Sequence, residues 1–534
     1  MFPSANQEQA SGGADVPSCE QQKQLALTNS FLLDLKARKE KLLAEITAQL
    51  STINEGLASL AEHGGGVVAP KAAPDTDHVD FSDSLGDGSQ ATSVTSKNDS
   101  SQGIEQKLPA SGTDFVQDHL EDLQEVYLQS RSIDDSFRSI SDFSDTLSRL
   151  SKYSRLKPVA SLDYAHGLYT GKASIICSID FDKDDEFFAT AGVLKKIKIF
   201  DFANVLHDYV KNSTLVADEE IASAKTSSSP LSANRKRKRS QMASESEEAD
   251  SQGDMVPRFP VIEIDCPSKV SCLAWDPEEK SRLASADYEG VLRLWDSSNG
   301  QLVQSHEEHE NRIWSLDWCP SEKSRFASAS DDAKGKIWTV NQKDAVATVS
   351  SVANLCSVRW NPTVPHHVAF GSADHHIHYY DIRNLHHPLH IFRGHRRAVS
   401  YVRFKDHDTL ISCSTDCTMR MWKLSESFQT GESQCVRTFS GHLNEKNFVG
   451  MSLDCNGEFL ACGSETNDVV VYWWQLPKPF IVTRMASMPN WLTGKRARQD
   501  DSDHFISSLS WQRTAPGRLI AANSQGKVTV MEMV

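Results

Sequence analysis

Hydrophobic and polar positions alternate over residues 261–424 in a phrase that recurs four times. Each phrase contains a small Ser/Ala-rich strand, an acidic turn and an alternating strand that ends on an aromatic residue. The phrases read LASADYEGVLRLWD, FASASDDAKGKIWTV, VAFGSADHHIHYYD and LISCSTDCTMRMWKL, and their closing aromatics are Trp295, Trp338, Tyr380 and Trp422. These aromatics are 43, 42 and 42 residues apart. Since successive side chains of a strand take opposite faces, the pattern predicts one small β-sheet per repeat.

A period of this length is typical of WD40 repeats and predicts one β-propeller blade per repeat. In VLRLW and TMRMW the apolar set is expected to pack between blades, while Arg293 and Arg420 point outward. Asp332 and Asp416 lie six residues before the closing aromatic, on turns where a carboxylate accepts backbone N–H bonds. With the Gly-His pairs at 394–395 and 441–442, they are interpreted as structural braces.

Three further stretches follow the same pattern: IICSIDFDKDDEFFATAGVLKKIKIFD, FVGMSLDCNGEFLACGSETNDVVVYW and FISSLSWQRTAPGRLIAANSQGKVTVMEM. The predicted fold class is therefore all-β, a seven-bladed WD40 β-propeller over residues 154–534. The last of these stretches lacks an outer strand of its own. Residues 156–164, LKPVASLDY, are predicted to supply that strand and close the ring, so that no long edge strand is exposed.

Residues 21–62 are predicted to form an α-helical coiled coil ahead of the propeller. Leu25, Leu32, Ile46, Ile53 and Leu60 keep a seven-residue step that is broken by Lys39, and an apolar face of this kind must be buried against another helix. We expect a homo- or hetero-oligomer through this helix. The alternative is a helix that docks on its own propeller.

The remaining segments are assigned from composition. Residues 1–20 and 63–113 are rich in Gly, Ser, Asp and Pro and are predicted to be disordered, because they bury too little apolar area to offset chain entropy. Residues 114–153 show a helical period and are predicted to form short helical segments. Two insertions, at about 203–257 and about 487–503, are predicted to interrupt the propeller.

The first insertion contains a run of basic residues followed by the acidic stretch SESEEADSQGD. We interpret the basic run as a nuclear-import signal read by an acidic groove, with a solvated polyampholyte loop as the alternative. Its members are Arg235, Lys236, Arg237, Lys238 and Arg239. A nuclear protein, with possible cytoplasmic residence, is the resulting expectation for localisation.

Composition narrows the class of protein further. The chain has 534 residues and a mean hydropathy of −0.44, no apolar run of about 18 residues, and an N-terminus unlike a signal peptide, so we expect an intracellular protein outside the membrane. The net charge of −16 argues against direct binding to nucleic acid. No G-x-S-x-G or H-E-x-x-H motif is present, and we assign no catalytic residue and no cofactor.

Eleven cysteines do not predict disulfides or a metal site, because most lie within strands of the repeats and no C-x-x-C pair exists. Cys413 and Cys417 are four residues apart but flank a blade turn, and we interpret them as structural. His375, His376 and His378 are not expected to bind metal, since His375 takes the other face of the strand.

Several stretches resemble the plant constitutive-photomorphogenic family of WD40 E3 ubiquitin ligases: DYEGVLRLWD, EEHENRIWSLDW, GSADHHIHYYDIRN, GHRRAVSYVRF, GHLNEKNFVG and CGSETNDVVVY. FLLDLKARKEKL resembles the coiled coil of that family. The second family that the sequence resembles is the phytochrome-signalling suppressor family, which partners this ligase family. The ligase family also carries a RING that binds two zinc ions, which this sequence does not contain. A RING-less relative and an incomplete sequence both remain open.

The resemblance implies a peptide site for an acidic segment followed by a Val-Pro pair. Lys269, Arg312 and Arg397 would provide cations for the acidic half, and Arg397 stands where the plant ligase has Lys. Tyr288, Trp314 and Phe448 would form apolar walls for the Val-Pro end, and Glu445 would anchor a basic or amide group. Asp381 and Arg383 in YDIR resemble the motif that docks propellers on the damaged-DNA-binding adaptor of cullin-4 ligases, with bracing of the next blade as the alternative.

Three functions follow from the resemblance. The first is a substrate-recognition and scaffold subunit of a nuclear ubiquitin-ligase complex that binds transcription factors and photoreceptors and represses light signalling, together with a RING-bearing or suppressor-family coiled-coil partner. The second is a full E3 ligase whose RING is missing from this sequence. The third is a decoy or assembly scaffold without ubiquitin transfer.

Overall fold

The computed structural model describes residues 26, 28–44, 47, 119, 122–124, 126, 146–163, 174–207, 260–485 and 504–534. Two compact units divide the chain, Met1–Lys152 and Tyr153–Val534. The segments predicted to be disordered, the basic run at 235–239 and nearly all of both insertions lie outside the described residues.

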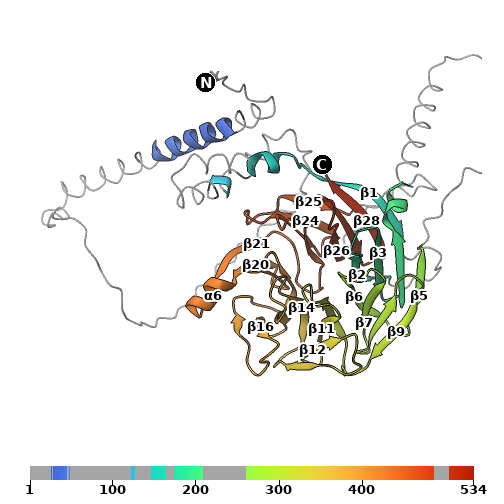
Figure 1. Ribbon diagram of the computed structural model, residues 1–534. Helices are drawn as coiled ribbons and strands as arrows, with labels where there is room; N and C mark the ends of the chain where they lie inside the picture. Colours follow the sequence, from blue (N-terminus) through green and yellow to red (C-terminus); the bar gives the residue numbers. More distant parts are fainter. Residues whose placement is uncertain are drawn as a thin grey trace, which may run out of the picture. The chain divides into compact units, whose positions relative to one another are not determined.

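The second unit is a ring of seven four-stranded antiparallel sheets (Figure 1). This confirms the predicted seven-bladed propeller, including the three blades read from the more divergent repeats. The first blade consists of β2 (Ile176–Phe181), β3 (Phe187–Gly192), β4 (Lys196–Asp201) and β5 (Ile262–Asp265). The second consists of β6 (Val270–Trp275), β7 (Arg282–Asp287), β8 (Leu292–Asp296) and β9 (Gln301–His306). The third consists of β10 (Ile313–Trp318), β11 (Arg325–Ser330), β12 (Lys334–Thr339) and β13 (Ala347–Ser350).

The fourth and fifth blades contain the last two of the four regular repeats. In the fifth blade, helix α6 (Leu424–Thr430) joins the third strand to the fourth. The strands are β14 (Leu355–Trp360), β15 (His367–Ser372), β16 (Ile377–Asp381) and β17 (His390–Phe392), then β18 (Val399–Phe404), β19 (Thr409–Ser414), β20 (Thr418–Lys423) and β21 (Cys435–Ser440).

The ring closes through a strand from the start of the second unit. The sixth blade is β22 (Met451–Leu453), β23 (Phe459–Gly463), β24 (Asp468–Trp473) and β25 (Ile481–Arg484), and the seventh is β26 (Ile506–Trp511), β27 (Arg518–Asn523), β28 (Lys527–Met533) and β1 (Leu156–Asp163). β1 pairs antiparallel with β28, from Leu156 opposite Met533 to Asp163 opposite Lys527. The predicted origin of the outer strand is confirmed.

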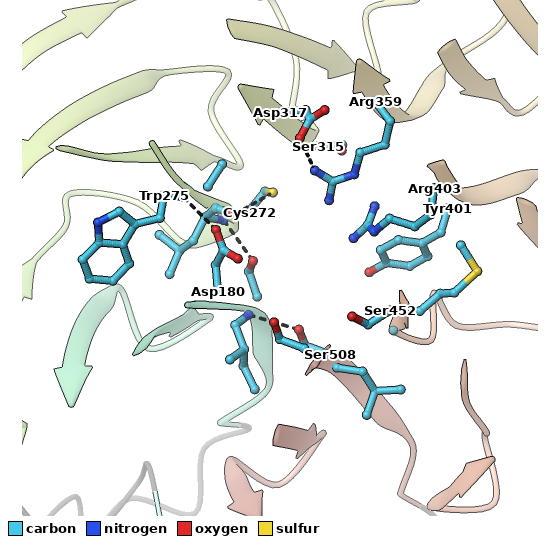
Figure 2. Close-up of a pocket in the computed structure, with 18 of the residues that line it drawn as sticks. Asp180, Cys272, Trp275, Ser315, Asp317, Arg359, Tyr401, Arg403, Ser452 and Ser508 are labelled. Carbon is cyan, nitrogen blue, oxygen red and sulfur yellow. Dashed lines mark hydrogen bonds and ion pairs between the residues drawn. The ribbon is translucent and has the colours of Figure 1, made fainter. Parts of the chain in front are cut away.

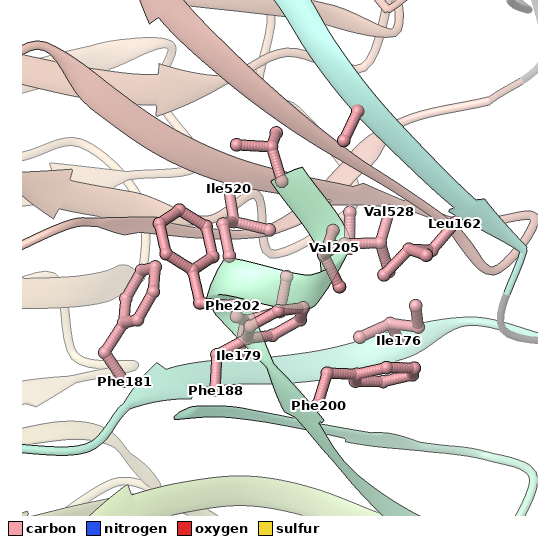
Figure 3. Packing of buried hydrophobic residues seen from close by; sticks show 13 residues of the cluster. Leu162, Ile176, Ile179, Phe181, Phe188, Phe200, Phe202, Val205, Ile520 and Val528 are labelled. Carbon is pink, nitrogen blue, oxygen red and sulfur yellow. The ribbon is translucent and has the colours of Figure 1, made fainter. Parts of the chain in front are cut away.

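Apolar side chains between neighbouring blades form the core. Figure 3 shows one such cluster, in which Phe181, Phe188 and Phe200 of the first blade pack with Ile520 and Val528 of the seventh. The Phe188 and Phe200 rings are stacked with centroids 5.2 Å apart. Because each fully buried side chain of this size contributes about 1.5–3 kcal/mol, the closure of the ring is driven by many contacts of this kind.

Serine hydroxyls connect the innermost strands of adjacent blades. The hydroxyl oxygen of a serine on one innermost strand accepts the backbone N–H of a residue on the next. These pairs are Ser508 with Ile179, Ser178 with Leu273, Ser315 with Val358, Ser357 with Val402, and Ser452 with Trp511, at 3.0–3.2 Å. The bonds satisfy amides that face the axis of the ring and hold the innermost strands in register.

Arg293 and Arg420 do not point outward as predicted. The Arg293 side chain is only 12% exposed, because its guanidinium forms an ion pair with the buried Asp287. Arg420 is half-buried, and its Nε is buried without a hydrogen-bond partner among the described residues. The physical reason is that each sheet of the ring is covered by a neighbouring blade on both faces, so the polar face of an alternating strand is also enclosed.

The first unit contains a helix over residues 28–44, within the predicted coiled coil. Phe31 is fully buried, whereas Leu42 and Leu43 are 47% and 67% exposed. Leu25, Ile46, Ile53 and Leu60 lie outside the described residues, and pairing with a second helix stays a prediction. Among the helices that the structure describes, none has the length and apolar character needed to cross a bilayer.

Candidate functional site

The residues predicted to bind peptide lie on one face of the ring. The innermost strands all begin at this face, and the turns between the second and third strands of each blade return to it. Three cations lie just before an innermost strand: Lys269 before β6, Arg312 before β10 and Arg397 before β18. Phe448 comes before β22, and Tyr288 follows β7. Strand direction therefore brings residues from separate blades to the same end of the central opening.

The Arg312 guanidinium is held between two aromatic rings. It lies 4.0 Å from the centroid of the Tyr288 ring and 4.7 Å from that of Trp314. Burial raises the pKa of the Tyr288 hydroxyl, and this hydroxyl lies 3.7 Å from the Cys177 sulfur. Cation–π contacts on both sides fix the direction of the guanidinium before any ligand arrives.

Trp314 forms an aromatic wall together with Phe448. The two ring centroids are 4.7 Å apart, with an angle of 53° between the ring planes. The Trp314 indole N–H donates to the Asp331 carboxylate at 2.6 Å, and Asn354 donates to the same oxygen at 3.0 Å. Sequence analysis did not identify Asp331 as part of the site. The sequence gives one sign of a role for Asp331: it directly precedes Asp332, in a turn that needs only one carboxylate as a structural brace.

The remaining predicted residues extend the site on both sides of this pair of rings. Lys269 is exposed, with its Nζ 5.8 Å from the centroid of the Tyr288 ring. Arg397 donates to the backbone oxygen of Glu445 at 3.3 Å. The Glu445 side chain is exposed. The structure therefore connects Lys269, Tyr288, Arg312, Trp314 and Phe448 in one contact chain, and joins Arg397 to Glu445 in a second group.

These cations are not neutralised by the described part of the propeller. Lys269, Arg312 and Arg397 form no ion pair with a described carboxylate, although the chain as a whole is acidic. The Nε of Arg312 is also buried without a hydrogen-bond partner among the described residues. Because a buried guanidinium donor is costly to leave unpaired, this face is suited to an anionic or carbonyl-rich ligand.

A central cavity of about 370 Å³ lies within the ring, lined by residues from all seven innermost strands, among them Trp314 of β10 (Figure 2). Arg359 forms an ion pair with Asp317, but Arg403 has no described carboxylate partner. Burial, together with the charge of Arg359, lowers the pKa of Arg403 to about 9, which leaves it protonated at neutral pH. Arg403 thus adds a positive charge inside the cavity, which the sequence did not predict.

The predicted adaptor-docking residues lie at the opposite ends of the strands. Asp381 is the last residue of β16, and Arg383 follows it. Arg383 donates to both carboxylate oxygens of Asp381, at 2.6–3.1 Å, and its side chain is 65% exposed. Hydrogen bonds from Arg383 lower the pKa of Asp381 to about 2. This pair lies away from the aromatic and cationic mouth.

His375, His376 and His378 do not form one group in the fourth blade. His375 occupies the turn, with a φ of 75°, while the ring of His378 lies 2.7 Å from the Asp374 carboxylate. Burial opposes ionisation of Asp374, but the hydrogen bond from His378 outweighs it and the pKa falls to about 2.

The repeats and the closed ring define a WD40 β-propeller protein. The model for the WD domain, G-beta repeat, matches residues 158–201, 386–423 and 433–472, and the model for the anaphase-promoting complex subunit 4 WD40 domain matches residues 261–321. E3 ubiquitin-protein ligase COP1 of Pisum sativum is 32% identical over 575 residues, covering 96% of this chain and 77% of the relative. The chain belongs to the COP1/SPA-type family of WD40 proteins.

Two further relatives support the same family. E3 ubiquitin-protein ligase COP1 of Arabidopsis thaliana is 37% identical over 428 residues, covering 77% of this chain and 54% of the relative. Protein SPA1-RELATED 4 of Arabidopsis thaliana is 36% identical over 395 residues, covering 74% of this chain and 43% of the relative. The chain spans about half the length of each of these two Arabidopsis relatives.

Proposed function

We propose that this chain is the substrate-recognition and scaffold subunit of a nuclear ubiquitin-ligase complex that represses light signalling. The propeller binds Val-Pro-type peptide motifs of transcription factors and photoreceptors and promotes their ubiquitination. Family membership supports the ligase setting, since two relatives are named E3 ubiquitin-protein ligase. The observation that carries the peptide site is the Arg312 guanidinium, stacked between Tyr288 and Trp314 with its Nε unpaired.

The geometry fits a peptide with an acidic half and an apolar end. Carboxylates of the peptide pair with Lys269, Arg312 and Arg397, and each hydrogen bond to a charged group contributes about 1.5–3 kcal/mol when enclosed. The Val-Pro end packs on the Trp314 and Phe448 rings. Because Arg312 and Trp314 are already held by ring contacts and by Asp331, binding loses less side-chain entropy than it would on mobile residues.

Docking on a cullin-4 adaptor is the second part of the proposal. Arg383 is exposed at the ends of the strands opposite the mouth, so an adaptor bound there leaves the peptide site open. The predicted coiled coil at 21–62 would recruit the RING-bearing or suppressor-family partner. Ubiquitin transfer itself is assigned to that partner.

Reconstitution tests this assignment. Adding the chain to an E2, a RING-bearing partner and a substrate with an acidic Val-Pro motif is expected to increase the rate of substrate ubiquitination. A substrate with Ala-Ala in place of Val-Pro is the matched control and is expected to gain nothing. With the cullin-4 adaptor present, Arg383→Ala should lose adaptor binding while peptide affinity is unchanged.

The outcomes separate the three candidate functions. Full-length transcript sequencing that finds an upstream exon with zinc-ligand residues would favour a full E3 ligase. Peptide binding without stimulation would favour a decoy or assembly scaffold and contradict the receptor assignment. Retained adaptor binding in Arg383→Ala would leave the pair Asp381–Arg383 with a bracing role only.

Nuclear import is assigned to the basic run at 235–239. Replacing all five residues by alanine is expected to shift a fluorescent fusion from the nucleus to the cytoplasm, because an importin groove reads consecutive cations. The matched control replaces the weaker basic patch of the second insertion, Lys495, Arg496 and Arg498. A fusion that stays nuclear after the first change would assign import to that patch or to a partner.

A further inference from the structure

The sixth blade lacks the brace found in the third and fifth blades. In those blades a His contacts a Ser and an Asp, and the closing Trp, ten residues after that Ser, donates to the same hydroxyl. The members are His309, Ser328, Asp332 and Trp338, then His395, Ser412, Asp416 and Trp422. In the sixth blade Tyr472 follows Cys462 by ten residues, so a thiol occupies the place of the serine.

The histidine of the sixth blade has correspondingly different partners. Its Nδ1 lies 2.9 Å from the Tyr472 hydroxyl. Its Nε2 is buried and has no hydrogen-bond partner among the described residues. When Nδ1–H donates to the tyrosine oxygen, Nε2 of His442 carries a lone pair that accepts no hydrogen bond from a described residue.

A second thiol reaches the same point from the neighbouring blade. Cys413 on β19 and Cys462 on β23 place their sulfurs 3.9 Å apart. The two sulfurs and a ring nitrogen of His442 all lie within 4.8 Å of one another. Both cysteines are fully buried, and His442 is 4% exposed. The group lies in the core between the fifth and sixth blades.

We propose that Cys413, Cys462 and His442 form a binding site for a thiophilic d¹⁰ metal ion, zinc(II) or copper(I), that links the fifth and sixth blades. The sequence predicted a structural role for Cys413, because it flanks a blade turn with Cys417. Two thiolates on a tetrahedral zinc ion, at about 2.3 Å each, stand about 3.8 Å apart, close to the observed separation.

The surroundings complete the requirements of such a site. The Cys413 sulfur lies within hydrogen-bonding distance of the Cys462 sulfur, so both thiols face the same point of the core. Tyr472 orients the imidazole through Nδ1, as outer partners of metal-bound histidines do. Because cysteine binds a metal ion as the thiolate, metal binding must release the thiol protons.

Asn444 distinguishes the two metals. Its Oδ1 is buried without a hydrogen-bond partner among the described residues, and its Nδ2 lies 3.5 Å from the Cys413 sulfur. Nδ2 also donates to the Ser414 backbone oxygen at 3.2 Å, so a turn of this amide gives up that bond when it offers zinc a fourth, oxygen ligand, whereas copper(I) is satisfied by the two sulfurs and the nitrogen alone.

The test measures metal retained by the full chain. The protein is refolded under reducing, oxygen-free conditions with one equivalent of zinc(II) or copper(I), passed through a gel-filtration column and analysed by mass spectrometry for metal. About one ion per chain is expected for one of the two metals, accompanied by a higher thermal unfolding midpoint. Cobalt(II) is expected to show thiolate-to-metal charge-transfer absorption, and intense d–d bands in the visible range if the site is tetrahedral.

Matched variants decide whether these residues hold the ion. Tyr472→Phe removes an outer partner of the histidine and is expected to weaken metal affinity by about 10- to 100-fold. Cys413→Ser removes a ligand and is expected to weaken metal affinity by more than about 100-fold. Cys356→Ser changes another buried strand cysteine and is expected to bind as the unmodified chain does. If Cys413→Ser does not fold, Tyr472→Phe provides the same comparison. No retained metal, or equal retention by Cys413→Ser and Cys356→Ser, would overturn the proposal.

Discussion

Replacement of Trp314 by alanine is expected to abolish binding of an acidic Val-Pro peptide while the propeller stays folded. Trp314 contacts both Phe448 and Arg312, so the change removes an aromatic wall and also one of the rings that orient the guanidinium. Aromatic anchors of this kind typically cost 2 kcal/mol or more when truncated, which corresponds to a loss of about 30-fold or more in affinity. Isothermal titration calorimetry measures the change directly.

Trp474→Ala is the matched control for this experiment. Trp474 is also half-buried and also has a cation on its ring, since Lys405 lies 4.6 Å from the centroid. It follows β24, at the opposite ends of the strands from the mouth. Peptide affinity is expected to be unchanged in this variant. Equal affinities for Trp314→Ala and the unmodified chain would place the peptide site elsewhere.

Loss of the Asp416 carboxylate is expected to destabilise the propeller by about 3 kcal/mol, because a buried brace would lose its acceptor. The Asp416 side chain is 6% exposed and accepts from the ring of His395 at 3.0 Å. It also accepts from the backbone N–H of Arg396 and from the N–H and hydroxyl of Thr418. Asp416→Ala leaves these donors unpaired in the core of the fifth blade.

Urea-induced unfolding, followed by tryptophan fluorescence, measures the change in the free energy of unfolding. Asp344→Ala, which removes an exposed carboxylate from the same propeller, is expected to stay within about 0.5 kcal/mol of the unmodified chain. A similarly small effect in Asp416→Ala would show that water replaces the brace without cost.

Lowering the pH is expected to remove the stability that the Asp416 carboxylate contributes. Burial opposes ionisation of Asp416, but hydrogen bonds from His395 and Thr418 outweigh it, and the pKa lies well below its usual value. The pKa of Asp332 is lowered in the same way by His309. A depressed folded-state pKa adds stability above the unfolded value of about 4, and that stability is lost as the pH falls below it. The difference between Asp416→Ala and the unmodified chain should therefore shrink below about pH 4.

The local pattern was sufficient for the architecture of the propeller. Period-two alternation, acidic turns and closing aromatics depend on a strand and its immediate neighbours, so seven blades and the pairing of β1 with β28 were both predicted. The same local logic failed for Arg293. Alternation shows that its side chain takes the face opposite Leu292, but it does not show that a neighbouring blade covers that face as well.

The candidate peptide site was predictable by resemblance and not by periodicity. The resemblance named Arg312 and Trp314, and the structure shows the guanidinium stacked on that ring. Asp331 was missed, because its bond to the Trp314 indole joins two positions 17 residues apart with no shared motif. Arg403 was missed for a similar reason, since its charge matters only because the innermost strands enclose it.

By itself, the sequence determined the repeat, the number of blades, the strand that closes the ring and the family. Tertiary structure alone decided which side chains meet across blades: Arg312 with the Tyr288 ring, and Cys413 with His442 and Cys462 in the core. The physical reason is range. Strand alternation is set by the backbone within a few residues, whereas these contacts depend on the twist and packing of sheets whose members are 20 to 50 residues apart in the chain.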